Sequence, residues 1–157
     1  MKAIAVALLL ALAACTPKGS EGGGVAADGT ALVPVTVAGQ GGTHTFRVEL
    51  AATPAAQQQG LMYRTDLPAD GGMLFRPYPP EGGPPRQANF WMKNTPAALD
   101  IVFIRADGTI ARIAENTVPF SEGLVSSGEP VAAVLELVGG RTAALGIGEG
   151  DKVSWPK

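Results

Sequence analysis

A hairpin signal in the second half of the chain constrains the fold most strongly. Two largely apolar runs, Leu99–Arg105 and Thr109–Ala114, flank the dipeptide Asp107-Gly108. This dipeptide between two β-type runs is typical of a tight hairpin turn. Several other short apolar runs, each bounded by glycine or proline, occur between Leu32 and Trp155. Because hairpin signals are frequent and parallel crossovers are not evident, the pattern favours a mostly antiparallel β structure.

The remaining strands are predicted from alternation or from short apolar composition. They are Leu32–Val37, Thr45–Leu50, Gly72–Phe75, Ala88–Thr95, Val131–Leu137 and Val153–Trp155. In the second of them we expect Phe46, Val48 and Leu50 to face the core. Pro34 cannot donate a backbone hydrogen bond, so the first strand is expected at a sheet edge.

Two short helices are predicted. Thr53 is a good N-cap and Pro54 is tolerated at the first helical position, so a helix is expected to begin there. We expect it to run through three glutamines to Met62 or Arg64, with Gly60 inside it at a close packing contact. One further helical turn is predicted over Arg141–Leu145. The predicted fold is α+β and mostly β, a compact antiparallel sheet or small barrel with one or two short helices.

The N-terminal residues have the pattern of a targeting signal. Lys2 precedes the apolar stretch Ala3–Ala11, which is shorter than the roughly 20 residues of a membrane-spanning helix. The stretch ends in Leu12-Ala13-Ala14-Cys15, which looks like a bacterial lipobox. We therefore predict a lipoprotein signal peptide over 1–14, a lipidated Cys15 with a flexible tether over 15–31, and one globular domain over 32–157. The alternative is an ordinary secretory signal in which Cys15 is incidental.

These features predict a location and exclude one class of partner. Thr16 stands where an aspartate would favour retention in the inner membrane, so we expect a lipid-anchored protein of the cell envelope, in the outer membrane and facing the periplasm. The net charge is −2 and no basic cluster occurs, which argues against nucleic acid as a partner.

A candidate binding face follows from polar residues inside apolar runs. Period two places Trp91 and Lys93 on the face opposite Phe90 and Met92. We expect Trp91, Lys93, Asn94, Asp100 and Glu136 to line a shallow pocket for a small polar or saccharide-like ligand, with 77–85 as its rim. In the alternative, Lys93 pairs with Asp100 or Glu136 and the polar residues are structural.

Other chemistry is less well supported by the sequence. Asp100 and Glu136 would suit glycan hydrolysis if their carboxyl groups lay roughly 5–9.5 Å apart in one cleft. Gly-x-Ser-x-Gly and clustered histidines are lacking, so a non-enzymatic role is favoured. The thioethers of Met62, Met73 and Met92 raise the idea of a Cu(I) site, but methionine is also an ordinary core residue. We expect no cofactor and no metal.

Several of these segments together resemble a known family. Gly60-Leu61-Met62, Gly72–Phe75, Phe90–Thr95 and Leu99-Asp100-Ile101 follow one another in the order seen in domain-of-unknown-function family 192. The resemblance implies a small mixed β fold and no particular reaction, since the family has no established activity. It leaves open a ligand-binding or envelope-component-binding domain, a hydrolytic enzyme, and a structural accessory to a partner protein. The last would display an exposed apolar patch.

Overall fold

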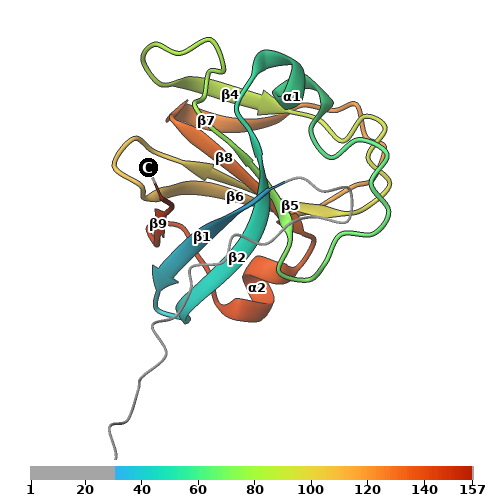
Figure 1. Cartoon of the computed structure of the whole chain (residues 1–157). Helices are drawn as coiled ribbons and strands as arrows, with labels where there is room; N and C mark the ends of the chain where they lie inside the picture. Colours follow the sequence, from blue (N-terminus) through green and yellow to red (C-terminus); the bar gives the residue numbers. More distant parts are fainter. Residues whose placement is uncertain (1–30, 157) are drawn as a thin grey trace, which may run out of the picture.

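The computed structural model describes residues 31–156, and nine strands and two helices make up its regular structure (Figure 1). The predicted signal peptide, Cys15 and nearly all of the tether lie outside these residues. The elements are β1 (Leu32–Gly39), β2 (Gly42–Ala51), α1 (Pro54–Gln59), β3 (Gly72–Phe75), β4 (Arg86–Phe90), β5 (Leu99–Ile104), β6 (Ile110–Thr117), β7 (Val125–Val131), β8 (Ala133–Val138), α2 (Arg141–Leu145) and β9 (Lys152–Ser154).

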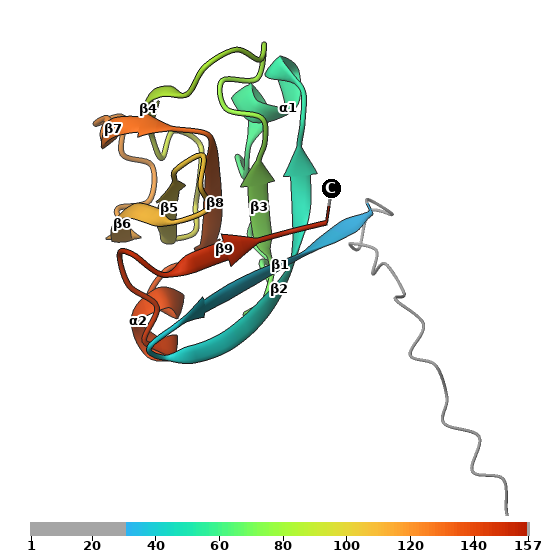
Figure 2. The ribbon, with the colours of Figure 1, turned by 90° about the vertical axis from the view of Figure 1, so that its left-hand side faces the viewer.

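Seven strands form one curled sheet in the order β6-β5-β8-β3-β2-β1-β9, and β4 and β7 form a second, small sheet. The curl gives the large sheet the shape of a half-barrel (Figure 2). Its two ends approach each other, because the backbone N–H of Val153 donates to Gly108 O at 2.8 Å and a β-bridge joins Thr109 to Lys152. The predicted mostly β fold with two short helices is thus confirmed.

One strand pair departs from the antiparallel pattern. Strands β2 and β3 pair in parallel, with α1 in the connection between them. A parallel pair needs a crossover of about a dozen residues or more. Residues 52–71 supply it, although their sequence shows only one short helix and no further regular element.

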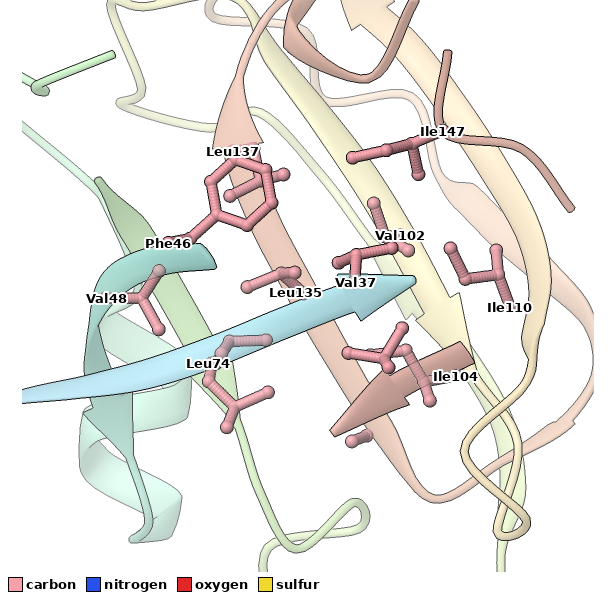
Figure 3. Packing of buried hydrophobic residues seen from close by; sticks show 13 residues of the cluster. Val37, Phe46, Val48, Leu74, Val102, Ile104, Ile110, Leu135, Leu137 and Ile147 are labelled. Carbon is pink, nitrogen blue, oxygen red and sulfur yellow. The ribbon is translucent and has the colours of Figure 1, made fainter. Parts of the chain in front are cut away.

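The large sheet carries an apolar cluster on each face. The inner cluster fills the half-barrel and contains Phe46, Leu74, Val102 and Leu135 (Figure 3). The outer cluster lies between the sheet, the β4–β7 pair and the segment after α1, and it contains Leu61, Phe75 and Phe103. Strand β5 is buried on both faces and contributes alternate residues to the two clusters.

The predicted Asp107-Gly108 turn and the predicted Thr53 cap are both confirmed. Strands β1 and β2 form a hairpin around residues 40–41, and β5 and β6 form another across Asp107-Gly108. Asp107 stabilises its turn by accepting from the backbone N–H of Thr109 at 2.8 Å. The Thr53 hydroxyl accepts from Ala56 N at 3.2 Å and caps α1.

The predicted extent of α1 is wrong. The helix ends at Gln59, because Gly60 takes a φ of 49° and terminates it instead of lying inside it. Neither α1 nor α2, the helices of the described part of the chain, is long and apolar enough to cross a membrane.

Four strand predictions also need correction. The predicted strand Ala88–Thr95 ends at Phe90, and residues 91–95 form a turn, so the period-two placement of Trp91 and Lys93 on one strand face is wrong. β1 is not an edge strand, since Thr36–Ala38 pair with β9, although Pro34 lies in the half of β1 that has no such neighbour. Leu50 is 39% exposed because it lies near the end of β2. The run Val131–Leu137 is divided by a bend at Ala132, which separates β7 in the small sheet from β8 in the large one.

Candidate functional site

A cavity of about 290 Å³ lies on the outer side of the large sheet. It is lined by residues of α1 and β4, which lie near each other at one end of the molecule (Figure 1). Its walls come from α1 and the turn after it, from the loop between β3 and β4, from the end of β4, and from the outer face of β8. The lining residues are Pro54, Gln57–Met62, Phe75, Tyr78, Pro80, Arg86, Asn89–Trp91, Lys93, Thr95 and Glu136.

Aromatic rings form much of the wall. Phe75 and Phe90 meet edge to face with their centroids 5.0 Å apart, and Tyr78 lies 5.9 Å from Phe90. These rings come from β3, β4 and the loop between them, which is how the Pro/Gly-rich segment 77–85 contributes to the cavity. Edge-to-face packing fixes ring orientation, so the apolar wall is preformed.

Glu136 is the ionisable group that the fold buries in this wall. It lies in the middle of β8, between Met73 of β3 and Ile101 of β5 in register, and only 4% of its surface is exposed. Across residues 31–156, its carboxyl group makes no hydrogen bond and no ion pair. Burial among apolar neighbours penalises the charged form and raises the pKa of Glu136 to about 8. Its carboxyl group is therefore mostly protonated at neutral pH.

Gln57 of α1 presents a second buried polar group. Its amide nitrogen donates to Ala51 O at 3.0 Å and to Pro77 O at 2.7 Å, which ties the helix to β2 and to the start of the loop. These two bonds fix the orientation of the amide. The amide oxygen is buried without a hydrogen-bond partner in the described part of the chain. A buried acceptor without a partner costs free energy, so it is uncommon in folded proteins.

The cations Arg86 and Lys93 and the indole of Trp91 lie nearer the solvent than Glu136 does. Trp91 is 41% exposed, and the ammonium group of Lys93 lies 5.0 Å from the centre of its ring. Lys93 is also 3.9 Å from Glu122, and Arg86 forms an ion pair with Glu81 at 2.7 Å. Both cations thus already have a carboxylate partner.

The structure brings together only part of the predicted face. Trp91, Lys93 and Glu136 line the cavity, whereas Asn94 lies beside it in a turn with a φ of 54° and donates to Met62 Sδ at 3.9 Å. The pairing of Lys93 with Asp100 or Glu136, offered as the structural alternative, is not seen because the nearest carboxylate to Lys93 is that of Glu122.

Asp100 does not line the cavity and has a structural role instead. It is fully buried on the inner face of β5, where it accepts from the backbone N–H groups of Asn116, Gly140 and Thr142 at 2.8 Å each. The Thr142 hydroxyl donates to it as well, at 2.7 Å. Gly140, the N-cap of α2, has no side chain to cap the helix. Asp100 therefore caps α2 from a neighbouring strand.

Asp100 and Glu136 do not face one cleft. In the β5–β8 pair, Asp100 is opposite Leu137 and Ile101 is opposite Glu136. Residues that are directly opposite share a face, and successive residues alternate. The two carboxyl groups therefore point to opposite sides of the sheet, which removes the geometry that a two-carboxylate glycosidase needs.

The methionines are dispersed. Met73 and Met92 are buried in the outer cluster, where Thr117 donates to Met92 Sδ at 3.1 Å, while Met62 lines the cavity. Within residues 31–156, His, Cys, Asp and Glu side chains form no group of three or more that could hold a metal ion.

Exposed apolar side chains gather in the loops beside the cavity. Tyr63, Val118, Phe120 and Leu124 are all well exposed. Backbone hydrogen bonds join their segments to residues 92–95, from Tyr63 N to Asn94 O at 2.8 Å and from Phe120 N to Thr95 O at 3.1 Å.

Sequence reasoning missed the residues that α1 and the start of β4 contribute, whereas the expected rim 77–85 includes the lining residues Tyr78 and Pro80. Gln57 and Arg86 line the cavity, yet neither lies in a run that stands out for its charge or period. The one available signal was the three consecutive glutamines after a capped helix start. A solvated helix face would show the same pattern.

Comparison with known proteins shows a family without an assigned activity. A protein of unknown function from Novosphingobium aromaticivorans DSM 12444 is 45% identical, with a TM-score of 0.79 over 87% of this chain and 94% of its own. A protein of Sinorhizobium meliloti 1021 described as a "putative transcription regulator" is also 45% identical, with a TM-score of 0.73 over 80% of this chain and 95% of its own. Among curated proteins, none matches the sequence significantly. The model of DUF192, described as "Uncharacterized ACR", matches residues 35–155, and the chain therefore belongs to domain-of-unknown-function family 192.

Proposed function

We propose that this protein binds a small polar ligand in the cavity between α1, β4 and the outer face of β8. The observation that carries the proposal is the burial of the Glu136 carboxyl in the cavity wall without a partner among the described residues. The preformed aromatic walls also support it. Apolar cavities with a few convergent polar groups and a perturbed acid are typical of binding sites.

The other functions are less well supported. Hydrolysis by Asp100 and Glu136 is not supported, because their carboxyl groups point to opposite sides of the sheet. The exposed side chains of Val118, Phe120 and Leu124 would suit an accessory role with an envelope protein. The cavity is the better-supported site, because exposed apolar residues are common on protein surfaces whereas a buried acid without a partner is not. The net charge of −2 gives no support to nucleic-acid binding.

A thermal-shift screen tests the binding proposal. The purified full-length chain is heated with separate sets of amines, amino acids, sugars and nucleosides. At least one set should raise Tm, because a ligand at 100 times its Kd stabilises the folded state by about 2.7 kcal/mol. Trp91→Ala should weaken binding of the same compound about tenfold, since the indole forms part of the wall.

Phe120→Ala is the matched control, because it removes an exposed aromatic side chain that does not line the cavity. It should leave the Tm shift unchanged. A screen in which no set raises Tm would overturn the proposal. An equal loss of binding in both variants would also overturn it, since the cavity would then not be the site.

We also propose that Cys15 carries a lipid that anchors the domain in the cell envelope, facing the periplasm. The support is the Leu12-Ala13-Ala14-Cys15 sequence after a short apolar stretch. Expression in a bacterium supplied with labelled palmitate should label the wild-type chain, and Cys15→Ser should abolish the label and release the protein from the membrane fraction. An unlabelled wild-type chain would instead indicate an ordinary secretory signal.

A further inference from the structure

Two glutamates lie in one row on the outer face of the large sheet, and they differ in whether an arginine pairs with them. Glu49 of β2 is opposite Met73, and Met73 is opposite Glu136 of β8. Arg64 binds Glu49 through both carboxylate oxygens, at 2.5 and 2.6 Å. Glu136 receives no such partner within residues 31–156, although it is the more deeply buried of the two.

The surroundings of Glu136 favour a cation as the missing partner. Gln57 also lines the cavity, and its amide nitrogen donates to backbone oxygens of Ala51 and Pro77, so the helix side of the cavity is held in place. Aromatic rings, whose faces attract cations, complete the wall. A group with N–H donors would satisfy the Glu136 carboxyl, and a positive charge would complement its carboxylate form.

An anionic ligand is not favoured by the cations at the mouth. Arg86 is already paired with Glu81, and Lys93 lies near Glu122. At the inner end of the cavity, Glu136 has no cationic partner among the described residues. At the outer end, Arg86 and Lys93 each have a carboxylate partner.

We propose that the ligand of this cavity carries a primary ammonium group, which binds the Glu136 carboxylate, and an apolar body that packs on the aromatic wall. This inference rests on the proposed function and deepens it by naming the ligand class. Binding transfers no atoms between ligand and protein, but Glu136 gives up its proton to solvent when the ammonium group takes its place.

The proton release makes affinity depend on pH. The charged and titratable groups around Glu136 are Glu49 with Arg64 beyond Met73, and Tyr78, Arg86 and Lys93 in the cavity wall. α1 contributes no titratable side chain. Because burial raises the pKa of Glu136 to about 8, free Glu136 is protonated at neutral pH. Affinity for an ammonium ligand should therefore rise up to tenfold per pH unit below about pH 8.

Three probes of similar shape test the inference: benzylammonium, benzyl alcohol and benzoate. Calorimetric titration of the full-length chain in two buffers of different ionisation enthalpy measures both Kd and the number of protons released. We expect benzylammonium to bind at least about tenfold more tightly than benzyl alcohol near pH 8 and to release close to one proton per molecule bound near pH 6.

Glu136→Gln keeps the shape of the side chain and removes its charge. It should abolish the preference for benzylammonium and the proton release, whereas the control Glu115→Gln, on the exposed side of β6, should retain both. Tm of each variant confirms that it is folded.

The possible failures are distinguishable. Equal or tighter binding of benzyl alcohol or benzoate would overturn the ammonium inference and leave the proposed function intact. Benzylammonium binding without proton release would also overturn it, because Glu136 would then not be the partner. If none of the three probes binds, the inference is overturned, and the thermal screen decides separately whether the cavity binds any ligand.

Discussion

Glu136→Gln is expected to flatten the dependence of stability on pH. In the wild type, burial raises the pKa of Glu136 from 4.5 to about 8 in the folded state, so the folded state binds more protons than the unfolded state between these values. The extra proton bound by Glu136 stabilises the folded state. This stabilisation is present in full below pH 4.5 and is lost as the pH rises through about 8. The slope is about 1.4 kcal/mol per pH unit, which amounts to a loss on the order of 4 kcal/mol between pH 5 and pH 8.

Urea unfolding of wild type and Glu136→Gln at a series of pH values measures this loss. Glutamine stays neutral at every pH, so the variant should lack the slope and should be the more stable protein near pH 8. Glu115→Gln removes an exposed carboxylate from β6 and should follow the wild-type profile. Parallel profiles for wild type and Glu136→Gln would show that the buried acid is not what makes stability depend on pH.

Asp100→Asn should destabilise the domain strongly, although it removes only one charge. Two of the four donors that now bind the carboxylate would face an amide NH2 group, which is itself a donor. Buried donors left without an acceptor, together with the loss of charge-assisted bonds, should cost about 3 kcal/mol or more. For a domain of this size, that lowers Tm by roughly 10 °C.

Thermal unfolding followed by circular dichroism measures the effect. Thr142→Val removes a single donor and should cost about 1 to 2 kcal/mol. Asp66→Asn changes an exposed aspartate and should leave Tm within about 1 °C of the wild type, as surface changes usually do. If Asp100→Asn behaves like Asp66→Asn, the four hydrogen bonds to Asp100 are not what holds α2 in place.

Local signals explain why much of the fold could be predicted. The Asp107-Gly108 turn and the Thr53 cap each depend on a few adjacent residues, and each is confirmed. The errors arose where distant segments decide the structure. Ala132 bends because the chain changes sheets there, and β1 acquires β9 as a neighbour from the far end of the sequence. Neither feature can be predicted from the residues of the local segment alone.

The same distinction holds for the candidate site. Asp100 and Glu136 look alike in the sequence, since each is a single acid within an apolar strand. Only the register of β5 against β8 shows that they lie on opposite faces. Asp100 meets four donors that the chain brings from residues 116, 140 and 142, whereas Glu136 meets Met73 and Ile101. The functional difference between them is therefore a property of the tertiary structure.

The pairing of β1 with β9 has a consequence for how the protein folds. Thr36 lies opposite Ser154, so this contact joins segments from nearly the two ends of the described chain. Contacts between residues so far apart in sequence form late, because the entropy of closing a long loop must be overcome first. Until the last strand is in place, β1 presents an open edge that can pair with another molecule. Slow closure would thus make nascent copies prone to aggregation, which gives a reason for a cell to keep them apart by chaperones during synthesis.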